Sequence, residues 1–202
     1  MTTGLRERKK LSAMRRIQAV ALDLFDQLGF ESVTIEQIAD GAEVSPSSVY
    51  RYFGTKEQVV LWDEGDIEFL EVVAAKLSDH PPVEAVRLAL AQVLTEYFAG
   101  NEERARRMTR LLFDEPALRT ALFEAVNGFT AVVAQALVHA SGRDEADLDA
   151  QVIATVLVGA LVVATRHWHE SGYAAPLGDE MERALAVVEN GLKLDHGNAD
   201  RG

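Results

Sequence analysis

The sequence contains no cysteine and no apolar run long enough to cross a bilayer. The lack of cysteine excludes disulfides, a thiolate nucleophile and cysteine-based zinc sites. The longest apolar stretch, Val152 to Ala164, contains Thr155 and is shorter than the roughly 20 residues that a membrane-spanning helix needs. It predicts a buried helix. No apolar signal-peptide core follows the charged first residues, so the chain is expected in the cytoplasm.

Basic residues are outnumbered by acidic ones, which gives a formal net charge of −12. Residues 1–60 carry eight of each sign, whereas residues 61–202 carry twelve basic and twenty-four acidic residues. Six cations lie in the first sixteen residues, namely Arg6, Arg8, Lys9, Lys10, Arg15 and Arg16. An acidic body limits non-specific adhesion to DNA while a basic end meets phosphates, so this charge distribution is compatible with specific DNA binding. A solvated charge run is the alternative for any one of these residues.

Apolar residues recur at helical spacing along the chain, and no segment alternates like a strand. An all-α fold of about nine helices is therefore predicted. The expected helices cover residues 11–28, 34–40, 45–53, 55–77, 82–98, 102–113, 116–140, 144–171 and 178–193.

Two short helices in the first third of the chain form a pair. Thr34 is expected to cap the first, with Gln37 returning the bond three residues later. Ser45 as N-cap and Pro46 in the first turn begin the second. In such a pair the first helix braces across the DNA backbone while the second lies in the major groove.

The second helix of this pair carries side chains suited to DNA. Small hydroxyls at its start, Ser45, Ser47 and Ser48, allow a close approach to phosphates and base edges. Long side chains with polar tips follow at residues 50–52. Lys56 begins the next helix, where a cation is unfavourable for the helix dipole and needs an anionic partner, which a phosphate would supply.

The runs Thr34 to Ala39 and Val44 to Glu57 resemble the DNA-binding signature of the TetR family of bacterial transcription regulators, over about residues 10–62. The resemblance implies a TetR-like fold, with a three-helix DNA-binding domain at residues 1–57 and a helical ligand-binding and dimerisation domain at 58–202. It also implies a set of phosphate contacts: Thr34, Tyr50, Tyr52 and Lys56. The residues nearest the bases would be Ser45, Pro46, Ser47, Ser48 and Arg51.

This sequence departs from the TetR-family signature at two positions. Glu43 stands where the turn often has glycine, and it is not assigned a DNA contact. Ser47 stands where the recognition helix often has another glycine, which leaves base preference open. The alternative for Tyr50 and Tyr52 is a core ring with its hydroxyl at the surface.

The last two expected helices carry much apolar surface for so short a chain, which favours burial against a second copy. The resemblance implies the same homodimer; the alternative is that both helices only line the intrachain core. The predicted interface residues are Val152, Val156, Gly159, Val163, Met181, Leu185, Val188 and Leu192.

An effector pocket would be apolar with a few polar groups. The candidate lining residues are Phe69, Tyr97, Phe98, Met108, Phe113, Phe123, Asn127, Phe129 and Trp168, although aromatic residues at helical spacing are more often plain core. The run Ala164 to Gly172 is similar to regulators that bind acyl-CoA-like ligands. Four arginines are candidates for an acidic headgroup or for a solvated helix face: Arg104, Arg106, Arg107 and Arg110.

A ligand-responsive repressor, released from a palindromic operator by a small and largely apolar effector, is the predicted function. The alternative keeps the fold and the DNA but replaces the effector with protein control or a nucleoid role. Catalysis is not expected: His167 and His169 point to different sides of a helix, and no phosphate-binding glycine loop or nucleophile elbow occurs. No cofactor, metal site or membrane partner is predicted.

Overall fold

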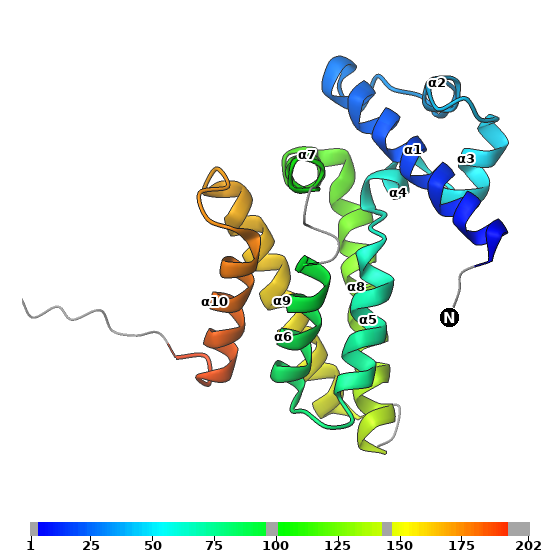
Figure 1. The fold of residues 1–202 in the computed structure, drawn as a ribbon. Coiled ribbons are helices and arrows are strands. Elements are labelled where there is room, and N and C mark those ends of the chain that lie inside the picture. The colour runs from blue at the N-terminus through cyan, green and yellow to red at the C-terminus, as the bar shows by residue number, and fades with distance from the viewer. Residues whose placement is uncertain (1–3, 96–100, 143–146, 194–202) are drawn as a thin grey trace, which may run out of the picture. The chain divides into compact units, whose positions relative to one another are not determined.

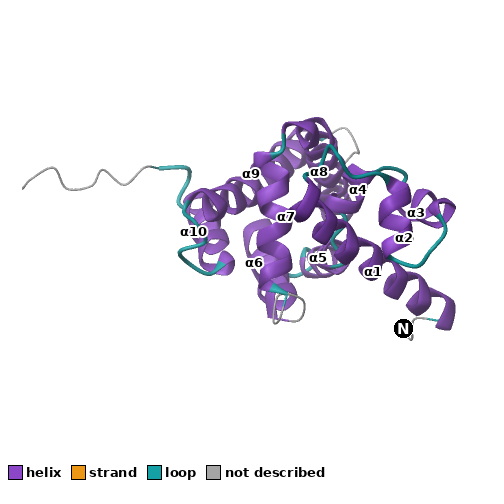
Figure 2. Cartoon of the chain, turned by 90° about the horizontal axis from the view of Figure 1, so that it is seen from above, coloured by secondary structure: helices purple, strands orange, loops and turns teal. Residues whose placement is uncertain are grey.

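The computed structural model describes residues 4–95, 101–142 and 147–193. Every regular element in this part of the chain is a helix, which confirms the predicted all-α class (Figure 2). The helices are α1 (Leu5–Leu28), α2 (Ile35–Gly41), α3 (Pro46–Phe53), α4 (Lys56–Leu61), α5 (Gly65–Lys76), α6 (Pro82–Val93), α7 (Glu102–Asp114), the 3₁₀ helix η2 (Pro116–Leu118), α8 (Arg119–Ser141), α9 (Leu148–Glu170) and α10 (Leu177–Glu189).

The prediction of one helix over residues 55–77 is wrong, because α4 ends at Leu61 and α5 begins at Gly65. Trp62 has an extended backbone, with φ −69° and ψ 120°. Its carbonyl oxygen accepts a hydrogen bond from the side-chain amide of Gln18 at 2.7 Å. Asp63 forms an ion pair with Arg104 at 3.3 Å. Partners on α1 and α7 thus stabilise the break, and this division accounts for the helix beyond the nine expected.

The chain divides into two compact units. Unit 1 comprises Met1–Asp63 and Glu103–Ala125, and unit 2 comprises Glu64–Glu102 and Val126–Gly202. Helix α7, which the sequence predicts to lie in the second domain, therefore belongs to unit 1 from Glu103 onward. The boundary between a DNA-binding domain and a ligand-binding domain, expected after residue 57, stays a prediction.

The core of unit 1 lies where one face of α1 packs against α2, α3 and α4. The buried residues of α1 fall at three- and four-residue intervals, as an amphipathic helix requires: Met14, Ile17, Gln18, Ala21, Leu22 and Phe25. Ile38 of α2 and Val49 and Phe53 of α3 are buried against them. Met108 of α7 belongs to the same cluster.

Arginine–aspartate pairs fasten α7 to α1. Arg107 lies 2.7 Å from Asp23 and 2.6 Å from Asp26, and Arg110 also pairs with Asp26. Burial opposes the charge of Arg107, but the hydrogen bond that it donates to Asp23 and the charge of Asp26 outweigh this and raise its pKa. The pairs therefore hold α7 on α1.

In unit 2, α5, α6, α9 and α10 pack together (Figure 1). Phe69 of α5, Val86 of α6, Leu157 of α9 and Leu185 of α10 share one buried cluster. A second cluster joins α9 to α8 through Val133 and neighbouring residues. The long apolar helix α9 thus contributes fully buried residues to both clusters.

Arg87 ties α6 to α10 at the surface of unit 2. Its guanidinium lies 3.0 Å from Glu182 and 2.9 Å from Glu189, with Glu84 on its own helix at 2.6 Å. The hydrogen bond to Glu182, followed by those to Glu84 and Glu189, raises the pKa of Arg87. Three carboxylates around one arginine fix the register of α10 on α6.

Two segments, Pro116–Ser141 and Leu148–Glu170, are long and apolar enough to cross a membrane when length and composition alone are considered. Core helices of water-soluble proteins meet the same criteria. Leu157, Val158 and Trp168 of α9 are buried within the chain itself. The apolar side chains of α9 thus form part of the core of the chain itself.

Candidate nucleic-acid interface

Helix α2 begins with the predicted reciprocal cap. The Thr34 hydroxyl accepts the backbone N–H of Gln37 at 3.3 Å, and the Gln37 side chain accepts the backbone N–H of Thr34 at 2.8 Å. The cap satisfies two N–H groups that a helix start otherwise leaves unpaired. Thr34 remains exposed, with its hydroxyl hydrogen available for a further acceptor.

The turn between α2 and α3 takes a left-handed backbone at Glu43, with φ 52°. This conformation explains why glycine is common at this position, since a residue with a side chain is strained there. The backbone N–H of Glu43 bonds to the Asp40 carbonyl and that of Val44 to the Ala39 carbonyl. The turn is therefore tight, and it fixes α3 on α2.

A cluster of serines forms the start of α3. Ser45 is the N-cap, as predicted, and accepts the backbone N–H of Ser48 at 3.3 Å. Its hydroxyl oxygen also lies 2.9 Å from those of Ser47 and Ser48. Pro46 occupies the first turn, where its missing N–H costs nothing. The cluster keeps the tip of α3 small and polar.

The middle of α3 presents two side chains to solvent. Tyr50 is 51% exposed, so it is not a core ring. Arg51 is exposed and bonds to the Ser48 hydroxyl at 3.3 Å and to the Tyr52 hydroxyl at 3.2 Å. Tyr52 is half-buried against the core of unit 1, with its hydroxyl at the surface, which is the alternative considered for it. Tyr50, Arg51 and the serines thus form the exposed face of α3.

Lys56 has partners that the sequence did not predict. Its ammonium donates to the backbone carbonyls of Phe30 at 2.8 Å, Val33 at 3.2 Å and Glu31 at 3.3 Å. It also lies 4.4 Å from the centre of the Phe30 ring. The need for an electronegative partner is met inside the chain, so Lys56 holds the segment that leads into Thr34. Its contact with a phosphate stays a prediction.

Replacing Lys56 by methionine should lower the free energy of unfolding by about 1–2 kcal/mol, because charge-assisted hydrogen bonds are lost while the aliphatic stem is kept. Urea unfolding measures this change. The salt dependence of DNA binding separates the two roles, since a lost phosphate contact lowers the slope by about 0.9 and a lost loop contact leaves it unchanged. If the variant and the parent protein had equal free energies of unfolding, Lys56 would not hold the segment that leads into Thr34.

Gln18 is the buried polar residue that sequence reasoning missed. It is 1% exposed, and its amide nitrogen donates to the carbonyls of Val59 at 2.9 Å and Trp62 at 2.7 Å. Its oxygen accepts from Arg104 at 2.6 Å. The one available signal was a glutamine on the apolar face of α1, next to Ile17. Gln18 joins α1, α4 and α7 at the point where the chain leaves unit 1.

The predicted dimer residues divide between the surface and the core. On α9, Val152 and Val163 are exposed and lie on one stripe with half-buried Val156 and Gly159. A side chain built on Gly159 would meet no atom within 4 Å. These four positions stay candidates for contact with a second chain.

The assignment on α10 needs correction. Leu185 is fully buried in the core of its own unit, so it has no surface to offer a second chain and that prediction is wrong. Val188 packs against the same core, and Met181 is half-buried. Leu192 lies beyond the end of α10 and is exposed, and Val187, which was not predicted, is exposed as well. The spacing of apolar residues predicted an apolar stripe on α10, but it did not show whether that stripe faced the core of unit 2 or a second chain.

The candidate ligand residues do not gather in one described cluster. Met108, Phe113 and Phe123 belong to unit 1, whereas Asn127, Phe129, Phe69 and Trp168 belong to unit 2. Met108 is a core residue, while Phe123 and Asn127 are exposed and Phe113 is half-buried. Tyr97 and Phe98 lie outside the described residues.

Two of these aromatic residues stay together, and one has a structural use. The rings of Phe69 and Phe129 stack with centres 5.8 Å apart. Trp168 is fully buried, its indole N–H donates to the Ala175 carbonyl at 2.8 Å, and its ring meets Tyr173 edge-on. Trp168 therefore closes the turn between α9 and α10, which leaves no polar group on it for a ligand.

The arginines of α7, which are the candidates for an acidic headgroup or for a solvated face, have partners within the chain. Arg104 is held by Asp63 and Gln18, and Arg107 and Arg110 are held by aspartates of α1. Arg106 is half-buried and also has a partner within the chain. The helix itself was predicted, but the partners of Arg104, Arg107 and Arg110 lie 41 to 86 residues earlier in the chain.

A capped helix, a tight turn and a second helix with an exposed polar face define a DNA-binding helix-turn-helix protein. The family model for bacterial regulatory proteins of the TetR family matches residues 17–61, and the model for the MftR C-terminal domain matches residues 80–193. The chain belongs to the TetR family of bacterial transcription regulators.

Relatives with similar sequences are regulators too. The chain is 28% identical to the transcriptional regulator TcmR of Streptomyces glaucescens over 82% of this chain and 77% of TcmR. It is 25% identical to the putative mycofactocin biosynthesis regulator MftR of Mycobacterium tuberculosis, over 92% and 93% of the two chains. The FadR repressor of Thermus thermophilus, solved with lauroyl-CoA, is similar in structure, with a TM-score of 0.56, 26% identity and coverage of 94% and 100%.

Proposed function

We propose that this protein is a homodimeric repressor that binds a palindromic operator through α3 and leaves it when a small, largely apolar effector binds. The observation that carries this proposal is the exposed face of α3: a serine cluster, Tyr50 and Arg51 on a helix whose other side is locked into the core of unit 1. A rigid helix with short polar side chains at its tip suits entry into a major groove. TetR-family regulators act on DNA in the cytoplasm, and we place this one there.

The contacts to DNA divide into two kinds. Thr34 and Tyr50 are exposed beside or on α3 and are assigned to phosphates, which position the protein without reading sequence. Ser45, Pro46, Ser47, Ser48 and Arg51 are assigned to the base edges. Arg51 is the strongest candidate for reading a base, because a guanidinium bonds two acceptors of a guanine at once. Tyr52 and Lys56 are also assigned to phosphates, and each has a partner within the chain, as Arg51 does.

Dimerisation is supported by the exposed side of α9. Val152 and Val163 are 51% and 63% exposed in the single chain, and Leu148 lies on the same stripe at 70%. Large apolar surfaces of this kind are rare in soluble monomers. Gly159, between the two valines, would let a second helix approach closely. A dimer with two-fold symmetry would place two α3 helices about 34–36 Å apart in successive grooves.

An acyl-CoA thioester is the effector class that we propose. The support is the FadR similarity, since that repressor was solved with lauroyl-CoA, together with the apolar clusters of unit 2 around Phe69 and Phe129. The acyl chain would pack among these apolar side chains of unit 2. The arginines of α7 are already paired with aspartates, so they are not proposed as ligands of the CoA headgroup. The effector releases DNA only as far as it binds the free and DNA-bound forms unequally.

The test is a titration of the protein against DNA fragments from around its own gene, with random duplex as competitor, at physiological salt. Binding to one palindrome that resists the competitor supports the proposal. In the same assay Arg51→Ala should lower affinity by about 1–3 kcal/mol and relax the preference at one position of each half-site. Tyr50→Phe is the matched control, because it changes a phosphate contact and should leave base preference unchanged.

Control by another protein is the competing function. Lauroyl-CoA added to the protein–operator complex distinguishes the two, with free CoA as the control for the nucleotide part. Release by lauroyl-CoA and not by CoA supports an acyl effector. A complex that is specific for the operator but indifferent to both would favour protein control.

A further inference from the structure

The guanidinium of Arg51 is held in place on the exposed face of α3. One of its terminal nitrogens, Nη2, donates to the Ser48 hydroxyl at 3.3 Å and to the Tyr52 hydroxyl at 3.2 Å. Its central carbon, Cζ, lies over the Tyr52 ring, 4.8 Å from the ring centre. Two neighbours thus fix the direction of a side chain that is otherwise exposed to solvent.

Both neighbours of Arg51 are themselves fixed. Tyr52 packs against the core of unit 1, so its hydroxyl is presented from an anchored ring. The Ser48 hydroxyl lies 2.9 Å from that of Ser45, which is the N-cap of α3 and accepts the backbone N–H of Ser48. The contacts of Arg51 therefore lead to the core on one side and to the start of the helix on the other.

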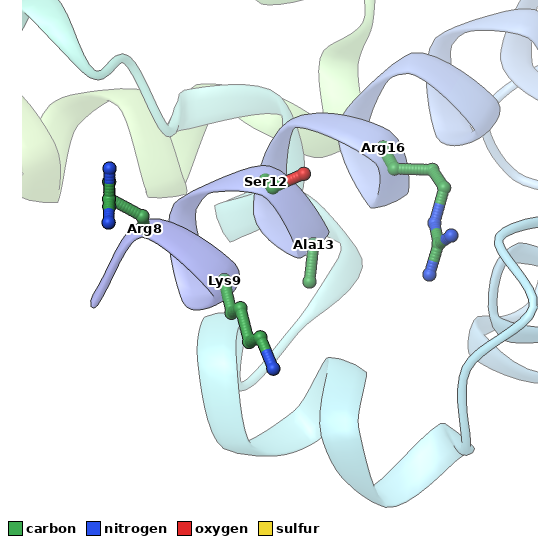
Figure 3. Close-up of a pocket in the computed structure, with 5 residues that line it drawn as sticks. All are labelled: Arg8, Lys9, Ser12, Ala13 and Arg16. Carbon is green, nitrogen blue, oxygen red and sulfur yellow. The ribbon is translucent and has the colours of Figure 1, made fainter. Parts of the chain in front are cut away.

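Other exposed cations of unit 1 are not held in this way. Arg8, Lys9 and Arg16 line an open pocket of about 410 Å³ on α1, and Figure 3 shows their side chains extended and apart from one another. Among the residues that the structure describes, none bonds to these three side chains. A helix alone does not fix an exposed cation, so the order of Arg51 depends on the two hydroxyls.

The held guanidinium keeps hydrogen-bond donors for a ligand. Its contacts to Ser48 and Tyr52 both use Nη2, so the N–H groups of Nε and Nη1 stay available to acceptors outside the chain. Within the described ranges Arg51 pairs with no carboxylate, so its charge is available to DNA as well. A side chain that is already fixed loses less rotamer freedom on binding, which favours the acceptor that fits its direction.

We propose that Tyr52 is a positioning residue for Arg51: its hydroxyl holds the guanidinium in the orientation that reads one base of the operator. This inference rests on the proposed function, and it adds a role in base preference to the proposed phosphate contact of Tyr52. The two roles differ in their effect. A phosphate contact strengthens binding to every sequence, whereas a positioned guanidinium strengthens binding to one base over the others.

The experiment measures the affinity of the full-length protein for operator duplexes that differ at one base pair, namely the pair at which Arg51→Ala relaxes the preference. The quantity compared is the ratio of affinities for the preferred and the substituted pair. Tyr52→Phe removes the hydroxyl and keeps the ring, and it should lower this ratio about three- to tenfold, which is what one hydrogen bond typically contributes.

Tyr50→Phe is the matched control. It removes a hydroxyl from the same helix, at a side chain that makes no contact with Arg51 in the described structure. This variant should bind all duplexes more weakly and leave the ratio of affinities unchanged. Urea unfolding of both variants checks that the fold is kept, since a general loss of stability would weaken binding to every duplex without changing the ratio.

A double-mutant cycle shows whether Tyr52 acts through Arg51. Where residue 51 is alanine, Tyr52→Phe should not change the ratio, because no guanidinium is left to position. A change of the ratio that persists without the arginine would show that Tyr52 contacts the base itself, and it would overturn the positioning role.

The remaining outcomes separate this inference from the proposed function. Equal ratios for Tyr52→Phe and the parent protein, on an operator that the parent protein prefers, would overturn the positioning role and leave the proposed function standing. An Arg51→Ala protein that keeps the parental preference at every base pair would also overturn it. A parent protein without any preferred duplex would overturn the proposed function, and the positioning role with it.

Discussion

Replacing Gly159 by glutamate should turn the protein from a dimer into a monomer and reduce operator affinity by two to four orders of magnitude. Two carboxylates would meet across the two-fold axis of an apolar interface, and unpaired charges buried in this way cost about 3–5 kcal/mol. Losing the second recognition helix removes the bivalent gain, which is about 10²–10⁴ in affinity. Sedimentation gives the oligomeric state, and the operator titration gives the affinity.

Gly128 provides the matched control. It also lies within a long helix, α8, and a side chain built there would likewise meet no atom within 4 Å. Each substitution removes a mid-helix glycine and adds one negative charge, so both should leave the helix intact or slightly stabilise it. Gly128→Glu should remain a dimer that binds the operator. A dimeric Gly159→Glu protein with parental affinity would show that α9 does not form the interface.

The local elements of the DNA-binding unit were predictable because their causes are local. The Thr34–Gln37 cap and the Ser45–Pro46 start depend on side chains within three residues of the groups that they satisfy. The same holds for the apolar face of α1, where spacing alone determines which residues share a side. Such signals also identified the exposed residues of α3 as the candidate interface.

The break between α4 and α5 was not predictable, because its causes are distant. Gln18 on α1 and Arg104 on α7 bond to Trp62 and Asp63, forty or more residues away in each direction. Asp63 and Gly65 weaken a helix locally, but the apolar periodicity continues on both sides of them. Tertiary hydrogen bonds outweighed a weak local preference.

The partners of charged side chains were not predictable for a related reason. The dipole argument correctly required a partner for Lys56, but it could not name the carbonyls of residues 30–33. The α7 arginines likewise needed anions and found Asp23 and Asp26. A sequence shows that a charge needs a partner, whereas only the fold shows which partner is near.

Replacing Gln18 by leucine should lower the free energy of unfolding by roughly 2–4 kcal/mol, because the carbonyls of Val59 and Trp62 and the guanidinium of Arg104 each lose a partner at a buried site. The change keeps the volume of the side chain and its apolar contacts. Urea unfolding followed by tryptophan fluorescence measures it, since Trp62 packs edge-on against Phe53 within the same unit.

Gln27→Leu, the same chemical change at an exposed position of α1, should stay within about 0.5 kcal/mol of the parent protein. Amide hydrogen exchange should then locate the loss: faster exchange in α4 and at Trp62 for Gln18→Leu, with α9 and α10 unchanged. If exchange rises equally in every helix, Gln18 supports only the general stability of the fold. A local rise makes it the anchor of the exit from the DNA-binding unit, through which any effector signal carried along the chain from α5 to α4 must pass.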